Sequence, residues 1–281
     1  MKLLKIIMCA AVALMTVVSC SPKKEAKDAP KSKVLVLYYS QTSNTKSVAQ
    51  EIATRLDADI EEISLVEPSD TAFQATIERC KADREKGILP EIKPLKANIA
   101  DYDWIFIGYP IWFGTYAPPI ASLLEKVDLS GKWVVPFCTF GSGGLESSAK
   151  DLTGKQPNAK VMPGYGVRAA RMDAMPAEVE SFLKTIGLIE GGVFVPADFP
   201  EQHPVSADEA AIFDAAVNGY PMLNAKAKTV ASRTILEGTE YLFTAMDKPR
   251  EDKPDMPPAS EIKVYVIVEK GKAPEFTRVV R

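Results

Sequence analysis

The sequence contains little histidine and cysteine, two of the residues from which nucleophilic and metal sites are often built. Its 281 residues include one histidine, His203, and four cysteines. We find no set of side chains that resembles a nucleophile with its base and an orienting group, so we predict neither a catalytic residue nor a metal site. His203 stands beside Pro204 and is expected to be a loop residue.

The sequence also has no excess of basic charge. Lysine and arginine number 34 against 37 aspartates and glutamates, which gives a formal net charge of −3. Proteins that bind nucleic acid normally carry a basic excess, so we predict no nucleic-acid partner. Two phosphate-binding motifs are absent as well, the G-x-x-x-x-G-K-[ST] of nucleotide triphosphatases and the G-x-G-x-x-G of dinucleotide-binding domains.

Long apolar runs are missing except at the N-terminus. There, Lys2 and Lys5 precede the apolar residues 6–18, a run too short to span a bilayer as a helix. This pattern predicts a signal peptide over residues 1–19. Its end, VVSC, resembles the lipobox of bacterial lipoproteins, which implies that Cys20 is acylated after cleavage. A simple secretory signal with an incidental cysteine is the alternative.

The segment after the signal, residues 20–32, has no apolar period and is rich in lysine, alanine, serine and proline. This composition predicts a flexible linker. A lipid at Cys20 would tether the protein to a membrane without making it span. We therefore expect the protein in the bacterial cell envelope, lipid-anchored and facing the periplasm or the surface.

Two cysteines belong to the part of the chain that is expected to fold. Cys138 lies in the apolar run 134–140 and is expected to be a buried small hydrophobic residue. Cys80 lies on a predicted helix. The sequence leaves open whether the two form a disulfide in an oxidising compartment.

From residue 33 to residue 190, strand-like and helix-like segments alternate with short connections. This alternation predicts an α/β fold with a doubly wound parallel sheet of five strands. The predicted strands cover residues 34–39, 60–65, 104–109, 133–140 and 160–167. The predicted helices cover residues 45–56, 71–86, 118–127, 145–152 and 177–188. Because ligands bind beyond the carboxyl ends of such strands, we expect the site in the loops after strands one, three and four.

The first of these loops carries hydroxyl and amide side chains directly before a helix. Its residues are Ser40, Gln41, Thr42, Ser43, Asn44 and Thr45. Backbone N–H groups, hydroxyls and the positive end of a helix can hold a phosphate dianion without a cationic side chain. The same residues are equally typical of a simple helix N-cap, and this loop alone does not decide between the two interpretations.

The other two loops carry an aromatic ring and a glycine-rich turn. The second loop contributes Pro110, Ile111, Trp112, Phe113 and Gly114. The third contributes Thr139, Phe140, Gly141, Ser142 and Gly143. A flat indole at the end of a strand can stack on a planar ligand, with core packing as the alternative role of Trp112. The glycines allow the backbone to approach a ligand closely.

Taken together, the three loops resemble those of the flavodoxin family. YYSQTSNT is similar to a strand followed by [ST]-x-T-G-x-T, the FMN phosphate loop, with Ser43 in place of the usual glycine. GYPIWFGTYAPP and PFCTFGSGG are similar to the flavin loops of one flavodoxin subfamily. The resemblance covers about residues 33–188 and implies that the residues of the three loops bind FMN. If position 43 needs a positive φ, serine is strained there and lowers the affinity for FMN.

The redox chemistry of such a protein is that of its FMN. The resemblance implies an electron-transfer protein, or an FMN-dependent NAD(P)H or quinone oxidoreductase, whose partner is a redox protein or a small-molecule acceptor. The same subfamily often carries arginine after strand five, where this chain has Arg168 and Arg171. The sequence leaves open whether these arginines meet a substrate or pair with carboxylates.

Residues 195–281 differ in character and predict a second, smaller α+β domain. Ser206 is expected to cap a helix that continues to Val217. Strands are predicted over residues 226–236, 241–246, 262–269 and 275–280, forming two hairpins.

One helix followed by antiparallel strands resembles the cystatin fold. TILEGTEYLF is similar to the first inhibitory hairpin of cystatins, Q-V-V-A-G-T-x-Y, although Thr234 and Glu237 replace the glutamine and alanine. The second hairpin, EKGKAP, lacks the tryptophan that inhibitors present. The resemblance implies an alternative function, a surface-tethered binding or cysteine-protease-inhibitory module, and a structural or docking role is the other interpretation.

Overall fold

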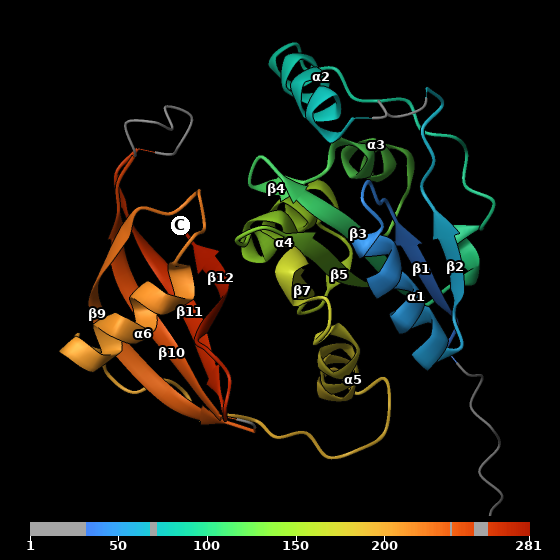
Figure 1. Cartoon of the computed structure of the whole chain (residues 1–281). Helices are drawn as coiled ribbons and strands as arrows, with labels where there is room; N and C mark the ends of the chain where they lie inside the picture. The colour runs from blue at the N-terminus through green and yellow to red at the C-terminus, as the bar shows by residue number, and fades with distance from the viewer. Residues whose placement is uncertain (1–31, 68–71, 237, 250–257) are drawn as a thin grey trace, which may run out of the picture. The chain divides into compact units, whose positions relative to one another are not determined.

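The computed structural model describes residues 32–67, 72–236, 238–249 and 258–281 (Figure 1). The predicted signal peptide, Cys20 and all but the last residue of the predicted linker lie outside these ranges. Among the described residues, no helix has the length and apolar character needed to cross a membrane.

A parallel sheet forms the centre of the N-terminal part (Figure 1). Its strands are β1 (Val34–Tyr38), β2 (Asp59–Glu62), β3 (Trp104–Trp112), β5 (Trp133–Phe140), β6 (Lys160–Val161) and β7 (Tyr165–Arg168). They lie in the order β2-β1-β3-β5-β6, and β7 also pairs with β5, so β6 and β7 share the fifth position. The predicted doubly wound, flavodoxin-like sheet is confirmed.

Both edge strands of the parallel sheet differ from the predicted ones. The expected strand over 160–167 is divided into β6 and β7. Pro163 lies between the two, and proline cannot donate to the hydrogen bonds of the sheet. The expected strand over 60–65 is shorter, because β2 ends at Glu62.

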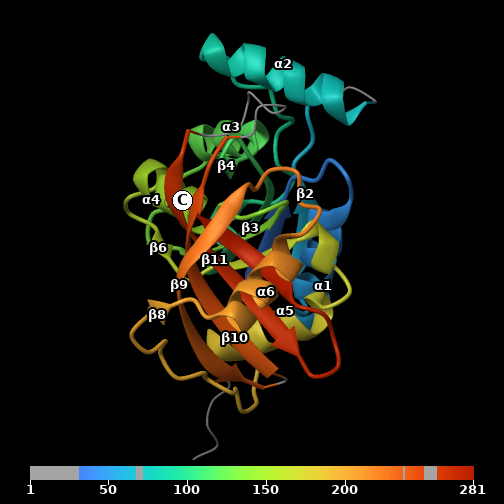
Figure 2. The ribbon, with the colours of Figure 1, turned by 60° about the vertical axis from the view of Figure 1, so that its left-hand side comes forward.

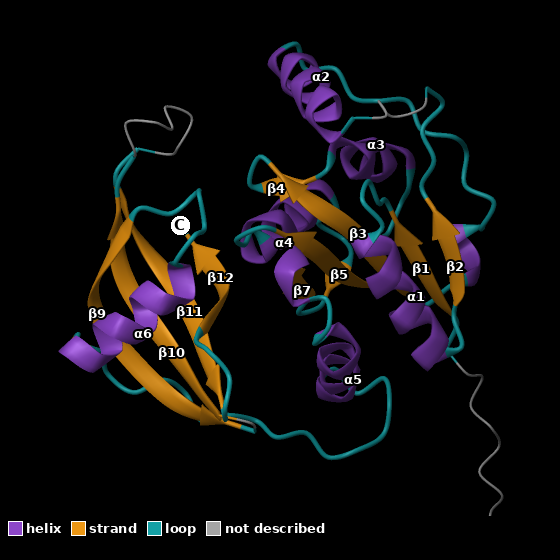
Figure 3. Cartoon of the chain, viewed as in Figure 1, coloured by secondary structure: helices purple, strands orange, loops and turns teal. Residues whose placement is uncertain are grey.

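Helices cover both faces of this sheet (Figure 3). They are α1 (Asn44–Leu56), α2 (Phe73–Glu85), α3 (Pro118–Lys126), α4 (Leu145–Lys155) and α5 (Met175–Thr185), with short 3-10 turns at Ile99–Asp101 and Ala169–Arg171. Successive strand residues point to opposite faces. Val36 and Phe106 therefore belong to the core cluster that also contains α1 and α5 residues, whereas Leu35 and Ile105 belong to the cluster shared with α3.

We call residues 195–281 the C-terminal module; the described part of this range contains an antiparallel sheet and one helix, as predicted. The elements are β8 (His203–Pro204), α6 (Ala207–Val217), β9 (Ala225–Ile235), β10 (Gly238–Asp247), β11 (Ser260–Glu269) and β12 (Glu275–Val280), with sheet order β12-β11-β10-β9-β8. Helix α6 lies across one face of the sheet (Figure 2), and Phe213 of α6 is buried in the same core cluster as Phe243. The predicted cap at Ser206 is confirmed, because its hydroxyl accepts from Glu209 in a capping box.

The loop position predicted for His203 is wrong. This residue lies in the two-residue strand β8, paired with Val230 of β9. β8 is an edge strand of the sheet, where Pro204 is tolerated because one side of the strand needs no donor. The His203 ring is exposed and its Nε2 lies 3.6 Å from a carboxylate oxygen of Glu209.

Candidate functional site

The first loop, residues 40–45, joins the carboxyl end of β1 to the start of α1. Ser43 is the N-cap of α1 and has a left-handed conformation with φ of 67°. Its side chain forms no capping hydrogen bond. Within the described ranges, no protein acceptor takes the backbone N–H groups of Thr42, Asn44 and Thr45. The positive end of α1 is therefore open to an anionic group.

Two side chains of the first loop hold its shape. The Ser40 hydroxyl accepts a hydrogen bond from the backbone N–H of Lys46 at 3.2 Å. The Gln41 carbonyl accepts from the Tyr39 hydroxyl at 2.7 Å, and the Gln41 amide donates to the Thr76 hydroxyl of α2 at 3.4 Å. These bonds fix the loop while its main-chain donors stay available.

The second loop is a β-hairpin rather than an irregular loop. β3 extends three residues beyond its predicted end and includes Pro110, Ile111 and Trp112, and β4 (Thr115–Tyr116) pairs back onto it. Only Phe113 and Gly114 form the turn, with φ of 52° and 81°. Two successive positive φ angles are the mark of a type I′ turn, whose twist suits a two-residue hairpin.

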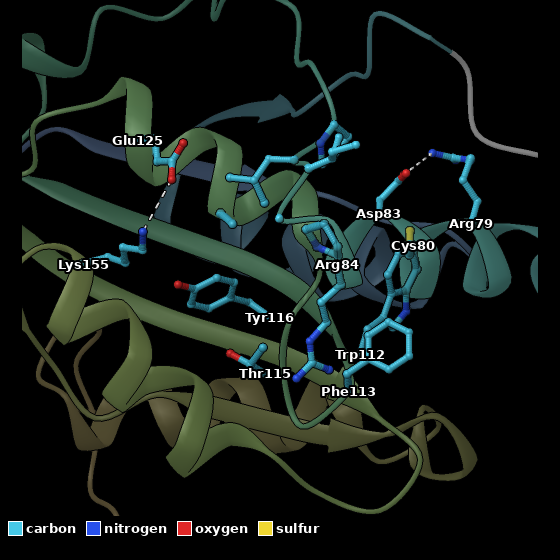
Figure 4. A pocket seen from close by; sticks show the side chains of 16 residues that line it. Arg79, Cys80, Asp83, Arg84, Trp112, Phe113, Thr115, Tyr116, Glu125 and Lys155 are labelled. Atoms are coloured by element: carbon cyan, nitrogen blue, oxygen red, sulfur yellow. Dashed lines mark hydrogen bonds and ion pairs between the residues drawn. The ribbon is translucent and has the colours of Figure 1, made fainter. Parts of the chain in front are cut away.

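Two aromatic rings of the β3–β4 hairpin differ in exposure and in their neighbours (Figure 4). Trp112 is 6% exposed and meets the Tyr39 ring edge-on, with 5.9 Å between ring centroids. Phe113 is 40% exposed, and the Arg84 guanidinium lies 5.5 Å from its ring centroid. The sequence singled out Trp112 as the stacking ring, and the structure adds Phe113 as a more accessible one.

The third loop lies beside the first. Thr139 and Phe140 are the last residues of β5, and residues 141–144 form the turn before α4. The buried hydroxyls of Thr139 and Thr45 are 2.8 Å apart and hydrogen-bonded. The structure thus brings the first and third loops together, as parallel strands with a shared carboxyl edge require.

The C-terminal strand β12 contacts the third loop directly. The Val279 N–H donates to the Ser142 carbonyl at 2.6 Å. A Cβ atom added at Gly143 would lie 2.1 Å from the Val279 carbonyl oxygen, and one added at Gly141 would lie 3.0 Å from the Tyr220 hydroxyl. Part of the space that these glycines leave is therefore filled by the chain itself.

Arg168 and Arg171 also bind residues of β12 close to the third loop. Arg168 is 8% exposed, and its guanidinium donates to the carbonyls of Gly141 at 3.0 Å and Phe276 at 2.7 Å. It also lies 3.5 Å from the centroid of the Phe276 ring. Arg171 pairs with Glu275 at 2.6 Å. Arg171 therefore pairs with carboxylates, one of the two roles that the sequence leaves open, whereas Arg168 bonds mainly to backbone carbonyls.

Sequence reasoning missed Phe276, Val279 and Tyr220 as neighbours of the third loop. The bond between Arg168 and Phe276 joins residues 108 positions apart. Local patterns report periodicity and turns, so they carry no signal for such a contact.

The described part of the chain contains two cysteines. Cys80 and Cys138 are both buried and neither forms a disulfide. Burial, with a smaller contribution from Glu146, raises the pKa of the Cys138 thiol well above its ordinary value. A thiol that stays protonated is a poor nucleophile and a poor metal ligand.

Comparison with known proteins finds one matching family and several similar solved structures. The family model described as Flavodoxin matches residues 33–181. A candidate flavoprotein from Bacteroides eggerthii DSM 20697 has 30% sequence identity over 55% of this chain and 98% of its own, with a TM-score of 0.49. A flavoprotein in complex with FMN from Lactobacillus acidophilus NCFM has 26% identity over 51% of this chain and 98% of its own, with a TM-score of 0.44.

Proposed function

The chain belongs to the flavodoxin family, and from this premise we propose that it is a redox protein that carries electrons on FMN. Family membership confirms FMN as the cofactor expected from the three loops. The observation that carries the proposal is the first loop, where the Ser43 side chain does not cap α1 and the N–H groups of Thr42, Asn44 and Thr45 have no protein acceptor among the described residues. A redox partner protein or a small-molecule acceptor would complete the reaction.

The residues present fit this cofactor. The N–H groups of residues 42–45, with the hydroxyls of Thr42 and Ser43, would hold the phosphate. The β3–β4 hairpin and the third loop would flank the ring. When bound, FMN supplies reversible electron uptake. The protein binds and orients the cofactor.

Electrostatics around the first loop favour a low reduction potential. The loop contains no cationic side chain, and the nearest lysine in sequence, Lys46, lies 3.8 Å from the carboxylate of Glu62. Little positive charge is therefore available to offset both a phosphate dianion and an added electron. We expect the reduced cofactor to be less stable than in free FMN, which lowers its potential.

Reconstitution of the purified chain with FMN tests the proposal. We expect flavin absorbance to co-elute with the protein and flavin fluorescence to be quenched on binding. A protein that elutes without flavin and leaves free FMN fluorescence unchanged would refute the function. The rates at which NADH and NADPH reduce the bound FMN then distinguish an oxidoreductase from an electron carrier. An oxidoreductase oxidises these nucleotides quickly, whereas a carrier does so slowly.

Replacement of Ser43 by glycine is expected to leave FMN binding at least as tight as in the wild type. Serine at a φ of 67° is strained by about 1 kcal/mol, and glycine adopts this conformation without that cost. Titration of both apoproteins with FMN by fluorescence checks this, with Ser47→Gly in α1 as the control that weakens the helix itself. A large loss of affinity in Ser43→Gly would show that the serine hydroxyl is itself a phosphate ligand.

We also propose that the protein is tethered to the cell envelope through a lipid on Cys20. The lipobox-like VVSC supports this, as does the linker composition of the segment that follows. Expressed in a bacterium that processes lipoproteins, the wild type should fractionate with membranes, and Cys20→Ala should appear in the soluble fraction. Equal distribution of the two proteins would contradict the tether.

For the C-terminal module we propose a docking role toward the third loop. The hydrogen bond from Val279 to Ser142 and the bonds of Arg168 support it. The cystatin resemblance stays a prediction, and inhibition of papain by the full chain would favour it over docking alone.

A further inference from the structure

A cavity of about 370 Å³ opens between α2, α3 and the β3–β4 hairpin (Figure 4). Its apolar lining includes Cys80, Leu89, Trp112, Tyr116 and Ala121. No residue of the first or third loop contributes to the lining described for this cavity. Its volume is that of a site for a small organic molecule, and its position is separate from the proposed phosphate site.

Apolar side chains are unusually exposed around this cavity. Ile88 is 51% exposed, Leu89 38% and Phe113 40%, and all three line it. Single exposed hydrophobic residues need no explanation, but several around one concavity mark a surface that a ligand can cover. The cavity therefore offers apolar and aromatic walls.

The charges around the cavity are paired with one exception. Arg79 lies 3.9 Å from Asp83, and Lys155 lies 3.5 Å from Glu125. Arg84 forms no ion pair with any carboxylate in the described part of the chain. Its side chain reaches from α2 to the Phe113 ring (Figure 4). One uncompensated guanidinium thus lies beside an aromatic ring.

We propose that this cavity binds a planar aromatic molecule with an anionic oxygen substituent, such as a sulfonated or carboxylated quinone. The aromatic ring would pack against Trp112 and Phe113, and the oxygens would accept hydrogen bonds from Arg84, whose fork of N–H donors suits a planar or multi-oxygen anion. Trp112 belongs both to this cavity and to the hairpin proposed to flank FMN. That the ligand is an electron acceptor rests on the proposed function, whereas its binding does not.

Calorimetric titration of the FMN-loaded full chain with 1,4-naphthoquinone-2-sulfonate tests the site. Arg84→Gln should raise the dissociation constant about tenfold, because a charge-assisted hydrogen bond is lost. It should change the binding of neutral 1,4-naphthoquinone much less. Ala121→Leu should weaken both probes by filling the cavity, while its FMN affinity stays that of the wild type. Lys81→Gln, which removes one exposed charge from the same helix outside the cavity, is the matched control.

The outcomes separate this inference from the proposed function. Sulfonate binding that is absent, or that is equal in the wild type, Arg84→Gln and Ala121→Leu, overturns the site even if FMN binds normally. If the chain takes up no FMN, the proposed function fails. The same titration on the FMN-free chain then still tests whether the sulfonate binds in the cavity, because that binding should depend on Arg84 and Ala121.

Discussion

Replacement of Arg168 by alanine is expected to lower the free energy of unfolding by about 3 kcal/mol. The guanidinium is buried, and its loss leaves the carbonyls of Gly141 and Phe276 without their donor and the Phe276 ring without its cation. Buried polar groups left unpaired carry the full cost of their desolvation. Urea denaturation followed by tryptophan fluorescence measures the loss.

Glu275→Gln is the matched control for this variant. Glu275 pairs with Arg171 and approaches Arg168 at 3.8 Å, but its side chain is 39% exposed. Solvent screens such a pair, so we expect a loss of less than about 1 kcal/mol. If Arg168→Ala loses no more than Glu275→Gln, the two carbonyls are satisfied by solvent and Arg168 does not hold the C-terminal module on the third loop.

The parallel sheet could be predicted because its signal is local. Continuous apolar strands such as residues 133–140 alternate with helices at short spacing, and this pattern is compatible with few arrangements. The strand order then places the loops after β1, β3 and β5 at one edge. The contact between Thr45 and Thr139 shows that two of the loops do meet there.

Two features of the site could not be predicted from the sequence, for different reasons. We predict a loop over residues 110–114, but pairing of Ile111 with Tyr116 extends β3, and the Phe-Gly turn between them is a weaker hairpin signal than Asn-Gly. The glycines of the third loop are predicted to let the backbone approach a ligand, and part of the space beside them is occupied by the chain itself. Nothing in PFCTFGSGG indicates that Val279, far along the chain, approaches Gly143.

Trp112→Ala is the second variant for which we expect a large effect. Trp112 is buried against Tyr39 and lines the cavity, so its removal enlarges an existing space and should cost about 3 kcal/mol of stability. If the indole also stacks on the flavin, FMN affinity should fall about tenfold in the same variant. Denaturation of the apoprotein and titration with FMN measure the two effects separately.

Trp112→Phe and Phe113→Ala distinguish stacking from packing. A phenyl ring at position 112 keeps a flat face, so FMN affinity should largely return while part of the stability loss persists. Phe113 is the more exposed ring of the hairpin, and Phe113→Ala should leave FMN affinity nearly unchanged if Trp112 is the stacking residue. Loss of FMN affinity in Phe113→Ala, with normal affinity in Trp112→Ala, would reverse the assignment and make Trp112 a core residue that supports the hairpin.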